Sequence, residues 1–276
     1  MTDETASSSD PQTVILLPGL LCDAAIWTDQ VAALAPCYRV MVLDPGERAS
    51  ITQMAERVLA EGPLRFSLAG HSMGARVAME VARLAPHRIA RLALLDTGAH
   101  PVRSGEAEKR QVMLDISAGQ GMRALADAWL PPMVGEARFA EDEALRETLY
   151  AMVERMTPAI HRAQIAALLA RPDAMAGLAA LRDMGSCPAL IGVGRDDRWS
   201  PPEQHEAIVA ALPEARFVIF EGAGHMAPLE APDAVSAALL AWMAMPIKAG
   251  PIKTGPIKEV SAPETSVSQT DGATVR

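Results

Sequence analysis

Short apolar runs alternate with helical patterns along most of this sequence, and this rhythm restricts the fold more than any other feature. Each run is continuously apolar and does not alternate between apolar and polar residues, which is typical of parallel strands covered on both faces. Strands and helices that alternate in this way predict an α/β fold with a doubly wound parallel sheet of about six strands. The predicted strands are Val14–Leu17, Arg39–Leu43, Arg65–Ala69, Arg91–Leu95, Ala189–Val193 and Arg216–Phe220.

Helices between these runs have recognisable ends. Ser50 lies three residues before Gln53, and this pair forms a capping box for a helix that continues to Leu59. A second helix follows the third strand and stops before Ala85-Pro86, because proline cannot continue a helix. That helix is Met73–Leu84, and the other predicted helices of this layer are Pro202–Leu212 and Pro232–Met243.

An interval of more than ninety residues without a convincing strand separates the fourth run from the fifth. Thr157 and Pro158 are typical of a helix cap and of a first helical residue. Such an insertion is expected to form a lid over the carboxyl ends of the strands, where these sheets bind ligands. Helices fit at about 105–118, 121–130, 140–155, 158–170 and 173–184, the last of which also fits the layer on the sheet.

These patterns divide the chain into four parts. We expect a disordered leader over 1–12, an α/β core over 13–98 and 186–246, a helical lid over 99–185, and a disordered tail over 247–276. The tail follows a Pro-Ile-Lys repeat of period five, and regularly spaced prolines prevent helix formation. The first twelve residues show no secretory signal, and no apolar run reaches the roughly 18 residues of a membrane span. A cytoplasmic protein is therefore expected.

The formal net charge of −9 argues against a nucleic-acid partner, because nucleic acid requires a basic surface. The sequence contains no metal-ligand motif, no phosphate-binding loop and no dinucleotide fingerprint. We therefore expect a small molecule as the partner, with neither a metal nor a cofactor. The sequence does not indicate an oligomeric state.

The stretch Gly70-His71-Ser72-Met73-Gly74 matches the pattern G-x-S-x-G, between a predicted strand and a predicted helix. Both glycines are required, because a Cβ at either position of so tight a turn would collide with the neighbouring strand or helix. The strained turn projects the Ser72 hydroxyl above the edge of the sheet. It also places this serine at a helix N-terminus, where partial positive charge stabilises developing negative charge. Ser72 is the candidate nucleophile.

A serine hydroxyl is a weak nucleophile at neutral pH and needs a base, usually histidine. His225 follows the last strand in a loop of small residues, which lets the loop pass close to the serine. His71 lies beside the serine, with its side chain expected to point elsewhere. His225 is therefore the candidate base. The remaining histidines are expected on the surface or in the lid: His87, His100, His161 and His205.

An acid that orients the base should lie between the serine and the histidine in chain order. Asp196 and Asp197 directly follow the fifth strand, and Asp96 ends the fourth, so all three lie at the expected edge of the sheet. Spacing favours Asp197 and leaves the other two open. The oxyanion hole needs two backbone N–H groups, which we assign to Met73 and to Leu20, in the loop after the first strand.

Taken together, these residues resemble the α/β-hydrolase superfamily over roughly residues 13–245, and most closely its small capped esterases, lactonases and C–C hydrolases. The resemblance rests on Leu-Pro-Gly-Leu, on the G-x-S-x-G pattern, and on Gly-Arg-Asp-Asp with Gly-Ala-Gly-His-Met downstream. In that family the third residue after the glycine of the acid motif is catalytic, which selects Asp197. Relatives commonly carry His-Gly where this chain has Pro18-Gly19, and usually begin with a hairpin for which there is no room here.

The predicted activity is that of a serine hydrolase of the carboxylesterase type, which cleaves a small to medium, mainly apolar ester through an acyl-enzyme. Methionines in the predicted lid and Trp129 indicate an apolar acyl pocket, although methionine at helical spacing is also typical of plain core. Lactone hydrolysis, C–C bond hydrolysis and acyl transfer use the same groups. A non-catalytic small-molecule receptor is the alternative of another class. The methionines are Met113, Met122, Met133, Met152 and Met156.

Overall fold

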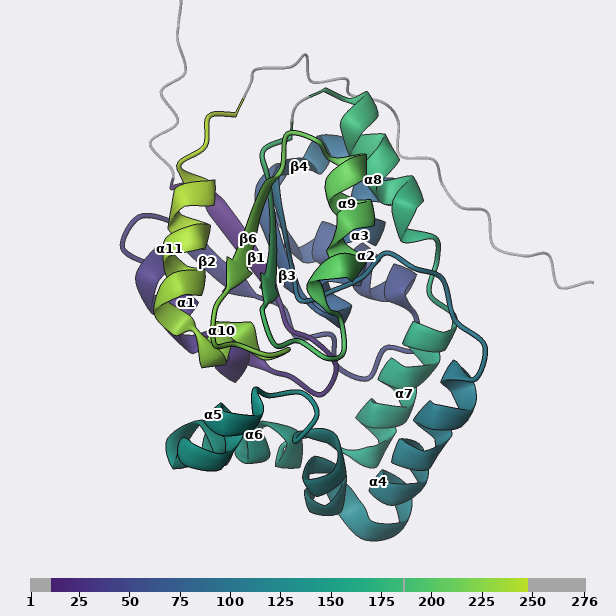
Figure 1. Ribbon diagram of the computed structural model, residues 1–276. Helices are drawn as coiled ribbons and strands as arrows, with labels where there is room; N and C mark the ends of the chain where they lie inside the picture. Colours follow the sequence, from purple (N-terminus) through teal and green to yellow (C-terminus); the bar gives the residue numbers. More distant parts are fainter. Residues whose placement is uncertain (1–10, 186, 248–276) are drawn as a thin grey trace, which may run out of the picture.

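A single parallel sheet of six strands forms the centre of the computed structural model, which describes residues 11–185 and 187–247 (Figure 1). The strand order is β2-β1-β3-β4-β5-β6, and each described strand lies within two residues of its predicted ends. The prediction of a doubly wound, six-stranded parallel sheet is confirmed. The strands are β1 (Thr13–Leu17), β2 (Arg39–Val42), β3 (Phe66–His71), β4 (Ile89–Leu95), β5 (Ala189–Gly194) and β6 (Arg216–Phe220).

Helices cover both faces of the sheet (Figure 1). On one face α1 (Thr28–Leu34) packs against α11 (Pro232–Met243). On the other face α3 (Met73–Leu84) contacts both α2 (Ile51–Glu61) and α8 (Ala174–Asp183), and α8 also contacts α9 (Glu206–Ala211). Short helical turns complete the core: η1 (Ala24–Trp27), η2 (Pro86–Arg88), η3 (Pro202–His205) and α10 (Ala227–Glu230).

The four inner strands are buried along their whole length, whereas β2 and β6 are only partly buried. The expectation that all six strands are covered on both faces is therefore wrong for these two. They form the edges of the sheet, where each has a neighbouring strand on one side only.

The position of α8 follows from one close contact. A Cβ on Gly177 would lie 1.9 Å from the carbonyl oxygen of Met79, so the backbones of α8 and α3 meet there. This contact places α8 in the helical layer that covers the sheet and not in the lid, although its sequence allowed both positions.

Between β4 and α8 the chain forms four helices, which we call the helical insertion: α4 (Glu106–Trp129), α5 (Glu136–Glu141), α6 (Glu143–Glu154) and α7 (Pro158–Leu169). They gather on one side of the sheet, below it in Figure 1. Gly121, at φ 88°, interrupts α4 at the predicted boundary between two helices. The Thr157 side chain accepts a hydrogen bond from the Ile160 N–H, which confirms the predicted cap.

Except for residues 11, 12 and 247, the predicted disordered leader and tail lie outside the described residues. Within the part of the chain that is described, no helix combines the length and the apolar character needed to cross a bilayer.

Candidate active site

Ser72 occupies a strained turn between β3 and α3. Its φ of 53° and ψ of −111° lie in a region that residues other than glycine rarely adopt. The two flanking glycines are explained by close packing. A Cβ on Gly70 would lie 2.4 Å from the backbone of Gly74, and a Cβ on Gly74 would lie 2.2 Å from the carbonyl oxygen of Leu17. The turn therefore depends on both glycines, as the sequence indicated.

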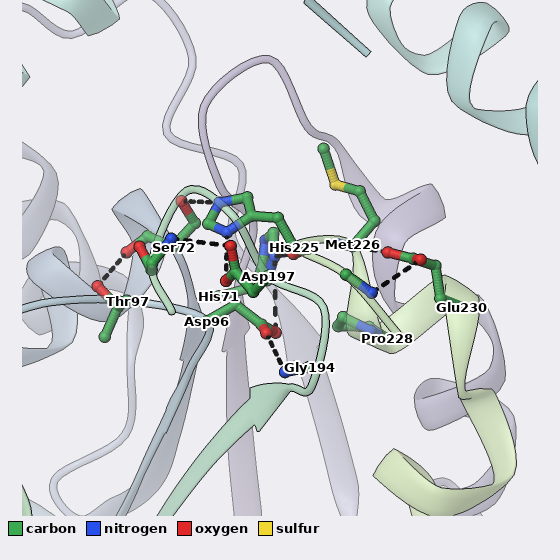
Figure 2. A network of polar contacts seen from close by, with 12 residues as sticks. His71, Ser72, Asp96, Thr97, Gly194, Asp197, His225, Met226, Pro228 and Glu230 are labelled. Atoms are coloured by element: carbon green, nitrogen blue, oxygen red, sulfur yellow. Dashed lines mark hydrogen bonds and ion pairs between the residues drawn. The ribbon is translucent and has the colours of Figure 1, made fainter. Parts of the chain in front are cut away.

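His225 lies within hydrogen-bond distance of Ser72 (Figure 2). Its Nε2 is 2.9 Å from the Ser72 Oγ, although the two residues are 153 positions apart in the chain. The ring is buried in the loop between β6 and α10, and the His225 N–H donates to the carbonyl oxygen of Met133 at 2.8 Å. The helical insertion thus contacts the backbone of this loop directly.

Asp197 completes a chain of hydrogen bonds through the other ring nitrogen. The Nδ1 of His225 is 2.8 Å from Asp197 Oδ2, and Oδ1 accepts the N–H groups of Trp199 and Ser200, each at 2.8 Å. Burial acts to raise the pKa of this carboxyl, but the charge of His225 and these hydrogen bonds outweigh it and hold the pKa below its ordinary value. Asp197 is therefore placed as an ionised partner of the imidazole.

The other two aspartates considered from the sequence do not contact His225. Asp196 is exposed. Asp96 is fully buried at the end of β4, where Oδ1 accepts the Gly194 N–H at 2.8 Å and Oδ2 lies 4.0 Å from His71 Nε2. Burial, reinforced by the charge of Asp197, raises the pKa of Asp96 well above its ordinary value. Of the three, the structure brings only Asp197 into hydrogen-bond distance of His225.

The two candidate oxyanion donors belong to the start of α3 and to the turn after β1. Met73 is the first residue of α3, and the first N–H groups of a helix have no partner within it. Leu20 lies in a tight turn in which the Cys22 N–H donates to the Gly19 carbonyl at 3.2 Å. A Cβ on Gly19 would lie 3.2 Å from the Ser72 Cβ, so this turn packs directly against the nucleophile turn.

His71 has a part in the site that the sequence reasoning missed. Its Nε2 lies 2.7 Å from the carbonyl oxygen of His225, and the two rings are 5.3 Å apart (Figure 2). Burial, assisted by the neighbouring His225, lowers the pKa of His71 to about 3. The ring is therefore neutral near pH 7 and its Nε2–H donates to the carbonyl. The prediction that this side chain points away from the serine agrees with these contacts.

Glu230 is a second residue that the sequence reasoning missed. Its Oε2 accepts the N–H groups of Gly135 at 2.8 Å and Gly224 at 2.9 Å, and its Oε1 accepts that of Met226 at 2.9 Å. The side chain is buried five residues after His225, near Met226 in Figure 2. One carboxylate thus binds the residues on both sides of His225 and Gly135 of the helical insertion. An acidic residue within an apolar stretch that follows the histidine is the signal that could have revealed it.

One expectation about the remaining histidines is wrong. His205, expected on the surface or in the lid, is fully buried, and its Nε2 accepts the Thr97 N–H at 3.0 Å. The helix predicted to start at Pro202 begins as the turn η3, and this turn brings the His205 ring into contact with the loop that follows β4. His161 is in α7 within the predicted lid, is buried, and pairs with Ser117 at 2.9 Å. His87 is exposed and His100 is half-buried.

A surface cavity of about 460 Å³ borders Asp197, and much of its lining is charged. It differs in character from the apolar pocket expected from the methionines, four of which are buried core residues of the insertion while Met113 is half-buried. Among the described residues, no group of three or more His, Cys, Asp or Glu side chains is arranged to hold a metal ion. The cavity is lined by Gly135, Glu136, Ala137, Arg195, Asp196, Asp197, Arg198 and Pro201.

The fold and this arrangement of side chains define a class. Residues 14–238 match the alpha/beta hydrolase family, so the chain belongs to that family. It is similar to a thermophilic esterase from Thermogutta terrifontis whose structure was solved with malate bound: 30% identity, 85% of this chain, 90% of that one and a TM-score of 0.74.

Two curated relatives extend this similarity. One, from Pseudomonas savastanoi pv. phaseolicola, is provisionally named carbamate hydrolase RutD; it is 27% identical over 81% of this chain and 90% of its own length. The other, from Nitrosomonas europaea, is a pimeloyl-(acyl-carrier protein) methyl ester esterase, 28% identical over 80% of this chain and 91% of its own length. The chain is accordingly an enzyme of the hydrolase type.

Proposed function

We propose that this chain is a serine hydrolase that cleaves a small to medium, mainly apolar carboxylic ester through an acyl-enzyme. The single observation that carries the proposal is the continuous hydrogen-bond chain from Ser72 Oγ through His225 to Asp197, with distances of 2.9 Å and 2.8 Å. Nucleophile, base and orienting acid in this order are the groups that acyl transfer requires.

The reaction follows from these positions. Ser72 Oγ attacks the ester carbonyl while its proton passes to His225 Nε2, and the electron pair of the C=O bond moves onto the oxygen. The N–H groups of Met73 and Leu20 stabilise that oxyanion. His225 then protonates the departing alcohol, and the acyl-enzyme remains. Water, activated by the same imidazole, releases the acid and restores Ser72. Asp197 holds the imidazole and stabilises its charged form throughout.

The substrate class rests on the relatives, two of which are named as esterases. The buried methionines of the insertion and Trp129 pack in the core and do not line the cavity beside Asp197. Lactones and C–C bonds are cleaved by the same groups, so a panel of p-nitrophenyl esters of increasing length, lactones and a diketone is the measurement that separates them. We expect the highest kcat/KM on short esters.

The test is the Ser72→Ala variant against p-nitrophenyl butyrate. We expect kcat to fall by at least about 10⁴-fold with an unchanged circular dichroism spectrum. The matched control is Ser236→Ala, a buried serine on α11, which should retain activity. A fluorophosphonate should add its mass to Ser72 in the wild type and not in the variant. An active Ser72→Ala variant would exclude the proposal, and a wild type that neither turns over nor labels would favour a receptor.

A further inference from the structure

Gln164 connects the helical insertion to the turn that carries the candidate oxyanion donor Leu20. Its side chain is fully buried on α7, the last helix of the insertion. Its Oε1 accepts the Leu21 N–H at 2.9 Å, across 143 positions of the chain. Its Nε2 donates to the carbonyl oxygen of Gly46, in the loop after β2, at 3.1 Å. One carboxamide therefore spans the loops that follow two neighbouring strands.

The turn that receives this contact is strained. It is closed by the bond from Cys22 N–H to the Gly19 carbonyl, and its third residue, Leu21, has a φ of 58°. A positive φ at the third position alone is that of a type II turn, where glycine is the usual residue. A leucine persists in this conformation only where its surroundings hold it there.

The hydrogen bonds that close and hold the turn do not use the Leu20 N–H. The N–H of Leu21 is taken by Gln164 and that of Cys22 by Gly19. The N–H of the second residue of such a turn, Leu20, takes no part in closing it. Gly19 packs against Ser72, and the peptide that carries the Leu20 N–H joins the peptide that carries the Leu21 N–H at the Leu20 Cα, so a rotation of the second peptide changes the backbone angles of Leu20 beside Ser72.

We propose that Gln164 is the positioning residue of the oxyanion hole, and that it fixes the Leu20 N–H by holding the Leu21 peptide against the loop after β2. A carboxamide fits this task because it carries an acceptor for the N–H and a donor for the carbonyl in one planar group. Neither a carboxylate nor an ammonium group provides both. This inference rests on the proposed function, since an oxyanion hole acts only in acyl transfer.

The expected consequence concerns the transition state and not substrate binding. When the carboxamide is removed, the strained turn is free to relax and the donor moves away from the developing charge. Deleting one oxyanion donor outright lowers kcat by roughly 10²–10³-fold in well-studied hydrolases. Displacing the donor without deleting it should lower kcat by less, roughly 10–100-fold, and should leave KM within about twofold of the wild-type value.

The experiment uses the full chain with Gln164→Met, which keeps the volume and the helix propensity of the residue. Two readouts are taken: kcat and KM on p-nitrophenyl butyrate, and the inhibition constant of a trifluoromethyl ketone. Ser72 adds to the ketone carbonyl, its proton passes to His225, and the resulting oxyanion needs the same donors. We expect kcat to fall and the inhibition constant to rise by similar factors. Gln164→Asn, whose side chain is one methylene shorter, should behave alike and replaces Gln164→Met if that variant does not fold.

The matched control is Ile165→Ala, the next residue on α7, which is 2% exposed and contributes packing to the same helix. It should lower the melting temperature and leave both readouts within about twofold. The inference is overturned if a folded Gln164 variant retains the wild-type kcat and inhibition constant, or if Ile165→Ala reproduces its losses. If the wild type itself shows neither turnover nor labelling of Ser72, the proposed function fails first.

Discussion

The carboxyl ends of β4 and β5 each present a buried aspartate, and the two behave in opposite ways. Asp197 receives two backbone N–H groups and the His225 ring, and its pKa is lowered despite burial. Asp96 receives one backbone N–H and lies close to the neutral His71, and its pKa is raised well above the ordinary range. Burial alone therefore does not decide the charge of a carboxyl group; the donors that face it do.

This difference separates the roles of the two carboxyl groups. An ionised acid can stabilise an imidazolium, whereas a protonated one supplies only a neutral hydrogen bond. A third buried carboxyl group, that of Glu230, accepts three backbone N–H groups. Three variants, each with one of these acids replaced by its amide, test whether the hydrogen-bond environment of an acid determines its contribution to catalysis.

The largest effect is expected for Asp197→Asn. The N–H groups of Trp199 and Ser200 would hold the amide oxygen at the Oδ1 position, so the amide NH₂ would donate to His225 Nδ1 and favour the wrong tautomer. We therefore expect kcat to fall by roughly 10³–10⁴-fold. Steady-state kinetics on p-nitrophenyl butyrate measure this. Asp196→Asn, at the exposed neighbouring position, serves as the control and should leave kcat unchanged. A loss below tenfold in Asp197→Asn would remove it from the proposed triad.

An intermediate effect is expected for Glu230→Gln. Its amide group would face at least one backbone N–H donor, so the flanks of His225 should shift. Displacements of this kind lower kcat by roughly 10–100-fold, and an unpaired buried donor costs about 1–3 kcal/mol of stability.

The readouts for Glu230→Gln are kcat, KM and the melting temperature. Glu80→Gln provides the comparison, since Glu80 is equally buried but pairs with Arg83 and Thr52 on helices of the core. It should lose stability and retain kcat. Equal loss of kcat in both variants would mean that Glu230 acts through stability alone.

The smallest effect on catalysis is expected for Asp96→Asn. Because its pKa is raised on folding, Asp96 stabilises the folded state when protonated, and this stabilisation is lost as pH rises from about 4, its unfolded value, through the folded pKa. Asparagine preserves the acceptor for the Gly194 N–H and removes the titration.

We expect Asp96→Asn to keep kcat within about threefold of wild type. Its melting temperature should depend less on pH and exceed that of the wild type at the alkaline end. Thermal melts from pH 5 to 9 measure the difference. A loss of activity comparable with that of Asp197→Asn would contradict the contrast drawn between the two acids.

Much of the fold could be predicted because parallel strands and their helices carry strong local patterns. Helices α3 and α11 begin and end at the predicted residues. The meeting of Ser72, His225 and Asp197 was also predictable in outline, since loops after parallel strands share one edge of the sheet. The choice of Asp197 over Asp96 and Asp196 required the family resemblance, because spacing alone allows all three.

The residues that escaped prediction act through backbone groups far away in the chain. Gln164 and Glu230 reach backbone N–H groups 143 and 95 positions away, and neither periodicity nor a motif indicates such a partner. His205 was misplaced because its helix begins with the tighter turn η3, which redirects the ring into the core. Local sequence patterns thus identify the candidate reacting residues more readily than the residues that hold those residues in position.

The contacts that the insertion makes with the loops around the candidate active site limit how this enzyme can be re-engineered. Exchanging residues 106–169 for the corresponding segment of a relative is an obvious route to a new substrate range. Such a chimera would sever the Gln164 bridge and the bond from Gly135 to Glu230. An active chimera therefore has to keep the residues on both sides of these hydrogen bonds. Otherwise its substitutions have to be confined to the parts of the helices that lie between them.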